Sequence, residues 1–204
     1  MIALVAWSLV VCAAPSADGW VLVADGDVRV FSRAKDGIRV KEMRAETVLA
    51  ARPEEVRAVL VDADYARRTP YVAETRLVEQ RSPTVKVTYT RLSFPIIDDR
   101  DYFIEVTREQ DLAADGTGVY HTTWKPWGLE LPPRTGSVRV TTNEGYWDVR
   151  PDPATGGSQV TYYLLSDPGG NIPTFAINLG NKRVLPDILH AIDKEIVRRR
   201  TAGP

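Results

Sequence analysis

The two histidines are the side chains best suited to acid–base catalysis or metal binding near neutral pH. His121 lies in a segment with the pattern of a strand, and His190 lies in a segment with the pattern of a helix. They are far apart in the chain, and neither stands in an Asp/Glu motif of the kind that binds a metal. We therefore predict no metal site and no catalytic residue. His121 is the residue whose position inside a ligand cavity, beside a carboxylate, would instead indicate catalysis.

The other reactive side chains give no stronger signal. Asp98 and Asp99 form an acidic pair that is most simply a solvated turn, and Cys12 is the only cysteine. No glycine-rich loop joins a strand to a helix in the manner of a phosphate-binding site. We therefore expect no cofactor.

The N-terminal segment indicates export. Residues 2–14 carry no charge, and a run of about 13 apolar residues suits a signal peptide but is too short to span a bilayer. We predict that residues 1–17 are a signal peptide, that residues 18–201 form the domain, and that the protein is periplasmic or secreted. The run lacks the usual preceding Lys or Arg. A buried N-terminal element, or a lipid anchor at Cys12, is the alternative.

Composition excludes several classes of function. The chain has 204 residues, 44% hydrophobic and 26% charged, and its formal net charge is −1. These values are ordinary for one soluble domain and give no electrostatic attraction to nucleic acid. We therefore expect no nucleic-acid partner.

The patterning predicts an α+β domain. Short helices are expected at 55–62 and 65–70, and a long helix at 173–199. Between them, alternating apolar residues and Gly-containing turns predict strands. The predicted strands are 20–23, 28–31, 38–49, 73–80, 83–92, 102–110, 118–124, 136–144, 146–150 and 158–166.

The terminal helix has two apolar faces. The second half, from Leu185 to Ile196, is expected to pack on the sheet. Phe175, Ala176 and Leu179 share a side of the first half and are expected to face a ligand. Gly180-Asn181 and Pro186 weaken the helix where the two halves meet, as a lid that must open would require.

Two longer segments resemble the START family of lipid-transfer domains. They are Pro95-Ile96-Ile97-Asp98-Asp99-Arg100-Asp101-Tyr102 and the stretch 160–173, which ends in Ser166-Asp167-Pro168-Gly169-Gly170-Asn171-Ile172-Pro173. The run from Asp64-Tyr65 to Glu74 is also similar. The resemblance implies a helix-grip fold: a curved antiparallel sheet, two short inserted helices and a long C-terminal lid helix over an apolar cavity. It also implies that the protein carries a lipid.

Several residues follow as candidates for ligand binding. Tyr89 and Asn143 are polar groups on strands expected to wall the cavity, and Trp124 ends another strand. Sterol-carrying members of the family have a charged pair in the pocket. Counting from Arg100 without gaps places Val87 and Val106 at those positions, which implies a more apolar site.

The loop after Trp124 is unusually apolar, since Trp127, Leu129 and Leu131 stand among prolines. One interpretation is a rim of the pocket mouth that touches ligand through Trp127 and makes transient membrane contact through all three residues. The alternative is a small core packed against the helix.

Three residues are expected to be structural. Arg100 beside Asp101 suggests a guanidinium held by carboxylates at the base of a loop. Asp167 precedes Pro168 and two glycines and is expected to accept hydrogen bonds in a turn.

The resulting hypothesis is a non-catalytic carrier that binds one hydrophobic molecule, a lipid or a sterol-like compound. One rival is a helix-grip enzyme, cyclase-like or hydrolase-like, acting on an apolar substrate in the same cavity. It would need a general acid or base there. The other rival is a protein-docking module that uses the loop 127–131.

Overall fold

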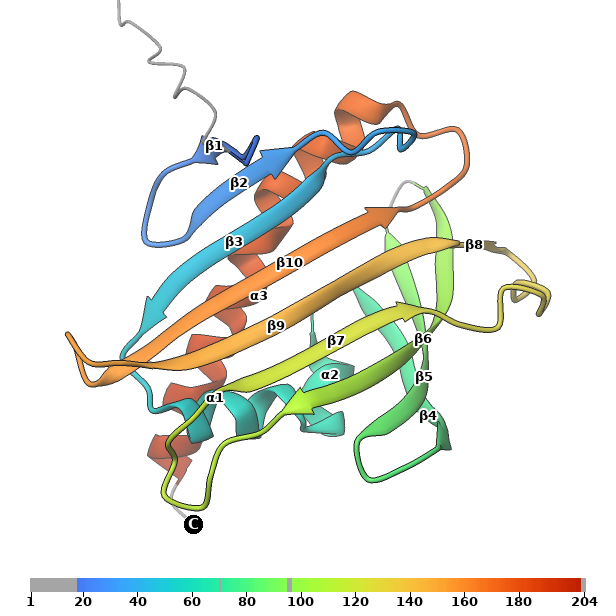
Figure 1. Ribbon diagram of the computed structural model, residues 1–204. Coiled ribbons are helices and arrows are strands. Elements are labelled where there is room, and N and C mark those ends of the chain that lie inside the picture. Colours follow the sequence, from blue (N-terminus) through green and yellow to red (C-terminus); the bar gives the residue numbers. More distant parts are fainter. Residues whose placement is uncertain (1–17, 70, 95–96, 203–204) are drawn as a thin grey trace, which may run out of the picture.

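A computed structural model describes residues 18–69, 71–94 and 97–202, and it confirms the predicted α+β class. Its strands form one twisted sheet in the order β1-β2-β3-β10-β9-β7-β6-β5-β4, with β8 paired in parallel to β6 (Figure 1). The strands are β1 (Val21–Ala24), β2 (Arg29–Arg33), β3 (Glu42–Leu49), β4 (Val72–Gln80), β5 (Val85–Phe94), β6 (Ile97–Gln110), β7 (Tyr120–Pro126), β8 (Ser137–Arg139), β9 (Thr142–Asp152) and β10 (Gly157–Asp167). The helices are α1 (Pro53–Leu60), α2 (Ala63–Arg68) and α3 (Thr174–Ala202).

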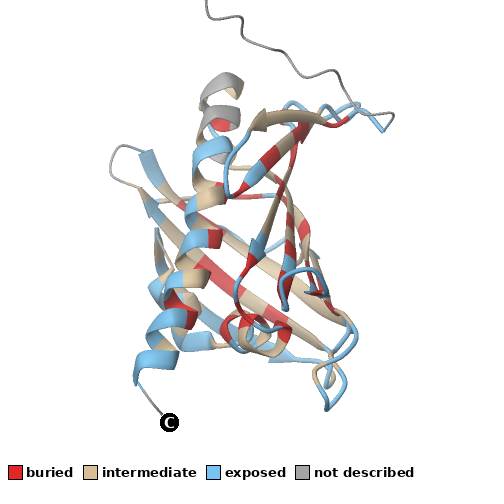
Figure 2. Ribbon diagram, turned by 90° about the vertical axis from the view of Figure 1, so that its left-hand side faces the viewer, coloured by how far each residue is buried: buried red, intermediate tan, exposed pale blue. Residues whose placement is uncertain are grey.

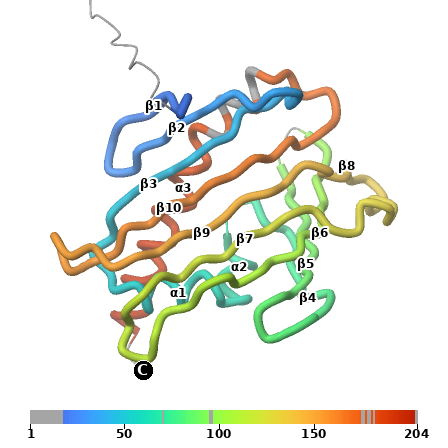
Figure 3. The backbone as a smooth tube through the Cα atoms, viewed as in Figure 1, coloured from blue at the N-terminus to red at the C-terminus, as the bar shows by residue number. Residues whose placement is uncertain are grey.

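The sheet joins the two ends of the chain. β3 and β10 pair antiparallel in register from Leu49 opposite Ser158 to Met43 opposite Leu164. Figure 3 shows the two strands side by side, although more than 100 residues separate them in sequence. The N-terminal strands therefore belong to the same sheet as the strands of the middle of the chain.

Helix α3 crosses one face of the sheet and supplies much of the core. Leu185, Leu189, Ile192 and Ile196 recur at steps of four and three and are almost fully buried. They pack with residues of β2, β3, β9 and β10. Figure 2 shows buried positions in red on both the helix and the strands. Each such side chain contributes roughly 1.5–3 kcal/mol when buried. The helix continues through Pro186, and no described helix is long and apolar enough to cross a membrane.

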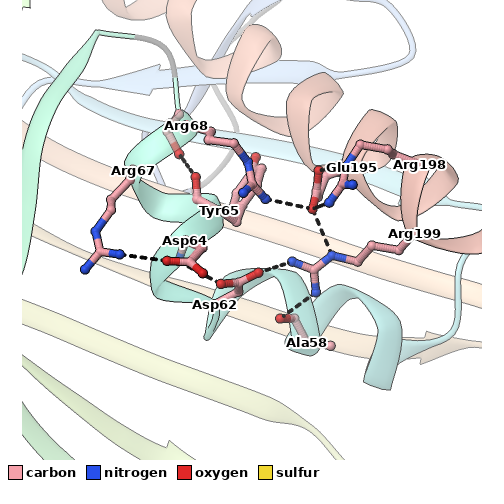
Figure 4. A network of polar contacts seen from close by, with 10 residues as sticks. Ala58, Asp62, Asp64, Tyr65, Arg67, Arg68, Glu195, Arg198 and Arg199 are labelled. Carbon is pink, nitrogen blue, oxygen red and sulfur yellow. Dashed lines mark hydrogen bonds and ion pairs between the residues drawn. The ribbon is translucent and has the colours of Figure 1, made fainter. Parts of the chain in front are cut away.

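A polar network ties the end of α3 to the segment containing α1 and α2 (Figure 4). Arg199 donates to the carbonyl oxygen of Ala58 at 3.1 Å, forms an ion pair with Asp62, and donates to Glu195 at 2.9 Å. Glu195 also accepts two hydrogen bonds from Arg198. Because α1 and α2 are short, these contacts fix their position against the long helix.

One predicted turn is wrong. Asn143-Glu144-Gly145 does not separate two strands, because β9 runs through it without a break. A Cβ atom on Gly145 would lie 2.2 Å from the carbonyl oxygen of Tyr163 and 2.3 Å from Cζ2 of Trp124. Glycine is needed here for close approach of a neighbouring strand and an indole ring, and it marks no turn.

Candidate functional site

A pocket of about 440 Å³ lies on the face of the sheet that carries α3, next to the packed core. This is within the ~300–1,000 Å³ range of small-molecule sites. Its described lining comes from β4, β5, β6, β7, β9 and β10, and from the segment of α1 and α2 through Leu60, Val61 and Ala66. Helix α3 thus covers the β2–β3–β10 side of this face, whereas the β4–β7 side borders a hollow.

Three aromatic side chains form one wall of the pocket. Trp147 stacks on Tyr162 with ring centroids 4.1 Å apart, and Trp124 lies 5.8 Å from Tyr162. The indole N–H of Trp124 donates to Oδ1 of Asn143 at 3.1 Å. Burial raises the pKa of Tyr162, so its hydroxyl stays neutral. The structure therefore brings the predicted residues Trp124 and Asn143 together at the pocket.

The β5 strand presents the opposite face from the one we predicted. Lys86, Thr88 and Thr90 line the pocket, whereas Val87 and Tyr89 are buried on the other side of the sheet. Tyr89 is thus not among the pocket-lining residues. The alternation of side chains suggested that the apolar face of β5 points into the pocket. Because the other face does so, Val87 does not line the site either. The pocket is consequently more polar than the sequence suggested.

The apolar face of β5 has its own cover. Tyr89 packs on Phe103 at 4.9 Å between ring centroids, and Phe103 packs on Trp127 at 5.8 Å. Trp127 therefore lies on the outer face of the sheet and not at the pocket, where we had placed it. The small core that was the alternative interpretation is present, but it forms on the sheet and not on a helix. Leu129 and Leu131 are 49% and 37% exposed.

The residues predicted to be structural hold loops in place. Asp101 is buried and accepts hydrogen bonds from Nε of Arg139 and the backbone N–H of Arg134, each at 2.9 Å. Arg100 donates to backbone carbonyl oxygens, including that of Pro168 at 3.3 Å, and not to the carboxylates that the sequence suggested.

Asp167 binds the guanidinium of Arg39 with both oxygens at 2.5 Å and accepts from the backbone N–H of Gly169 at 2.9 Å. It therefore closes the turn that leads into α3.

Sequence reasoning missed the two cations of the pocket. Lys86 and Arg108 both line it, on neighbouring strands. Burial lowers the pKa of Lys86, and repulsion from Arg108 lowers it further. The signal available in the sequence was Arg108 at an even spacing from Val106 on β6, which places both on one face.

Both histidines have carboxylate partners, which sequence spacing did not reveal. Nδ1 of His121 lies 3.0 Å from Asp148, and Nε2 of His190 lies 2.7 Å from Asp27. His121 lies in a groove on the other face of the sheet, since its neighbours Tyr120 and Thr122 line the pocket. The described residues contain no group of three metal-binding side chains.

Some predicted residues lie outside what the structure describes. The side chains of Phe175, Ala176 and Leu179 are among them, as are residues 1–17. Their predicted roles, as pocket-facing helix and signal peptide, stay predictions.

The fold and pocket together define a helix-grip protein, in which a curved sheet holds a long C-terminal helix and leaves a hollow beside it. A STAR-related lipid transfer protein from Xanthomonas axonopodis is similar in structure, with a TM-score of 0.75, 30% identity, and coverage of 89% of this chain and 100% of that one. The chain belongs to the StAR-related lipid-transfer (START) family. No family model matches it.

Two relatives known from sequence extend the comparison. An uncharacterised protein of Pseudomonas aeruginosa is 30% identical over 165 residues, covering 79% of each chain. Phosphatidylcholine transfer protein of Rattus norvegicus is 27% identical over 177 residues, covering 85% of this chain and 81% of the relative.

Proposed function

We propose that the protein binds a single lipid or similar hydrophobic molecule in the pocket and carries it without chemical change. The observation that carries this proposal is the hollow of about 440 Å³ between the aromatic wall and the side chains Ile104 and Val106. A buried CH₂ group contributes roughly 0.8 kcal/mol, so an acyl chain in this space supplies substantial affinity. The lipid-transfer relatives support the same proposal.

Two parts of the predicted site belong to this proposal. The first half of α3, through Phe175, Ala176 and Leu179, would close the pocket over the ligand. The exposed side chains Leu129 and Leu131 would make transient contact with a membrane during loading, because exposed apolar groups favour its interface.

A carrier is favoured over an enzyme by the lining itself. Among the described residues of the pocket there is no carboxylate and no imidazole, and burial raises the pKa of its three tyrosines, so their hydroxyl groups stay protonated at neutral pH. Lys86 is the remaining candidate base in the described lining. The pair His121–Asp148 lies on the opposite face of the sheet. The pocket also favours a carrier over a protein-docking module, because docking through the loop 127–131 requires no hollow inside the protein.

The test is lipid occupancy of the purified protein, measured by native mass spectrometry and by mass spectrometry of the extracted lipids. Ile104→Trp places an indole in the hollow and should abolish occupancy. Lys125→Trp makes the same change at an exposed site on the outer face and should leave occupancy unchanged. A wild-type protein that neither co-purifies with lipid nor takes it up from vesicles would contradict the proposal, as would full occupancy of Ile104→Trp. A recovered ligand with altered covalent structure would favour the enzyme.

A further inference from the structure

The charges of the pocket have one sign. Lys86 on β5 and Arg108 on β6 both line it, and no carboxylate accompanies them among its described lining. Lys86 stands opposite Val106, and Arg108 follows Val106 by two residues on the same face of β6. The two cations are therefore near neighbours at one end of the hollow, beside the turn that joins β4 to β5.

The two cations differ in how they are neutralised. Nη1 of Arg108 lies 3.3 Å from Oδ2 of Asp111, and Nη2 donates to the carbonyl oxygen of Pro83 at 3.1 Å. Asp111 also binds Arg57 with both oxygens, at 2.5 and 2.8 Å, so one carboxylate serves two guanidinium groups. Within the described chain, Lys86 has no ion pair, and its ammonium group donates no hydrogen bond. An unpaired, partly buried ammonium next to a second cation is unfavourable unless an anion joins them.

The polarity of the pocket changes along β6. Tyr102, Ile104, Val106 and Arg108 alternate along its inner face, so two apolar side chains lie between the tyrosine and the cationic end. The aromatic wall lies across the strands from this row, because Trp124 pairs with Val106 and Trp147 stands level with Arg108. With a rise of about 3.4 Å per residue, this row spans roughly 20 Å. The site thus offers an apolar path that ends in two positive charges, which is the complement of an amphiphile with an anionic head.

We propose that the ligand is an anionic amphiphile, whose carboxylate or phosphate group is bound by Lys86 and Arg108 and whose hydrocarbon part lies along Val106 and Ile104 toward Tyr102. This inference rests on the proposed function, because it names the class of molecule that the same pocket takes. Charge-assisted hydrogen bonds to the head group fix the direction in which the chain enters.

The experiment compares probes with one chain and different heads. Dodecanoate, dodecyl phosphate, 1-dodecanol and dodecyltrimethylammonium are titrated, below their micelle concentrations, into the delipidated full-length protein by isothermal titration calorimetry. Inorganic phosphate is the arm without a chain. Wild-type protein should prefer the two anionic probes. Lys86→Met should weaken dodecanoate and dodecyl phosphate about tenfold to a hundredfold, the usual contribution of a hydrogen bond to a charged group. It should leave 1-dodecanol within about twofold.

Two further variants guard the interpretation. Lys86→Arg keeps the charge and should retain most of the affinity for dodecanoate. Lys125→Met removes a charge from the outer face of the sheet, where Lys125 pairs with Glu105, and should change nothing. Together the two variants show whether a loss of affinity for dodecanoate in Lys86→Met is caused by removing the positive charge at this site.

The outcomes separate the two proposals. Equal wild-type affinity for 1-dodecanol and dodecanoate, a preference for dodecyltrimethylammonium, or an unchanged Lys86→Met would overturn the anionic head while leaving the carrier intact. Inorganic phosphate bound as tightly as dodecyl phosphate would overturn the amphiphile, because the hydrocarbon chain would then contribute nothing to the affinity. Failure of every probe that has a chain would overturn the carrier itself.

Discussion

The substitution Gly145→Ala tests whether the aromatic wall depends on the absence of a side chain in β9. An ideal Cβ at this position lies 2.2 Å from the carbonyl oxygen of Tyr163 and 2.3 Å from Cζ2 of Trp124. A Cβ atom essentially never lies within 3.0 Å of such an atom, so the backbone of β10 must move by about 0.8 Å and the indole of Trp124 by about 0.7 Å. Overpacking typically costs about 1–3 kcal/mol. Because one of the two clashes is with backbone, we expect a loss in unfolding free energy near the upper end of that range.

The assay is thermal unfolding by calorimetry together with tryptophan fluorescence. For a chain of this length each kcal/mol corresponds to about 2–4 °C, so Gly145→Ala should lower Tm by roughly 6–12 °C. It should also shift the tryptophan emission, because Trp124 must move. Gly180→Ala is the matched control: it lies in α3 with nothing within 4 Å of the added Cβ, and it should raise stability by about 0.5–1 kcal/mol. A Tm for Gly145→Ala within 2 °C of wild type, with unchanged emission, would refute the close approach.

Three other predictions concern Glu195, Asp101 and the N-terminal segment. The hydrogen bond from Arg198 lowers the pKa of Glu195 to about 2, so the stability that this carboxylate contributes is complete above pH 4.5 and is lost as the pH falls toward 2. Glu195→Gln should remove roughly 1 kcal/mol of this acid-dependent stability, measured by urea unfolding at several pH values. The figure is small because the Arg198 side chain is largely exposed. A stability loss of equal size at pH 7 and pH 2 would contradict this assignment. Arg139→Met leaves the buried carboxylate of Asp101 without its ion-pair partner, and it should lower the free energy of unfolding in denaturant by about 3–5 kcal/mol. A decrease below about 1 kcal/mol would show that Asp101 does not depend on Arg139. Export predicts a mature protein that lacks residues 1–17, and intact-mass measurement of the protein from its producing cell should find a start near Asp18; an intact N-terminus would exclude cleavage.

The sequence was sufficient to predict the elements whose apolar residues recur with a clear period. The spacing from Leu185 to Ile196 predicted the buried face of α3, and it forms the core against the sheet. Alternation and turn residues also predicted the strands and the three helices in their order along the chain, apart from the break at Gly145. That error arose because glycine serves both turns and close strand approaches, and only the position of Trp124 distinguishes them.

The pocket was harder to predict, because other parts of the chain pack near both faces of β5. Alternation correctly separated Lys86 and Thr88 from Val87 and Tyr89, but it could not say which set faces the hollow. The packing of Tyr89 on Phe103 decides the question, and this contact depends on the path of the segment around Trp127. Asn143 and Trp124 could be placed because they lie on strands whose inner faces meet at the pocket.

The pairing of β3 with β10 has a consequence for synthesis of the protein. The strands from Val21 to Leu49 join the rest of the sheet only through residues 158–164, and α3 follows later still. During translation, the first quarter of the chain therefore waits for almost all of the remainder before its hydrogen-bonding edge is covered. Such long-range closure makes folding slow and leaves an unpaired edge open to other chains in the meantime.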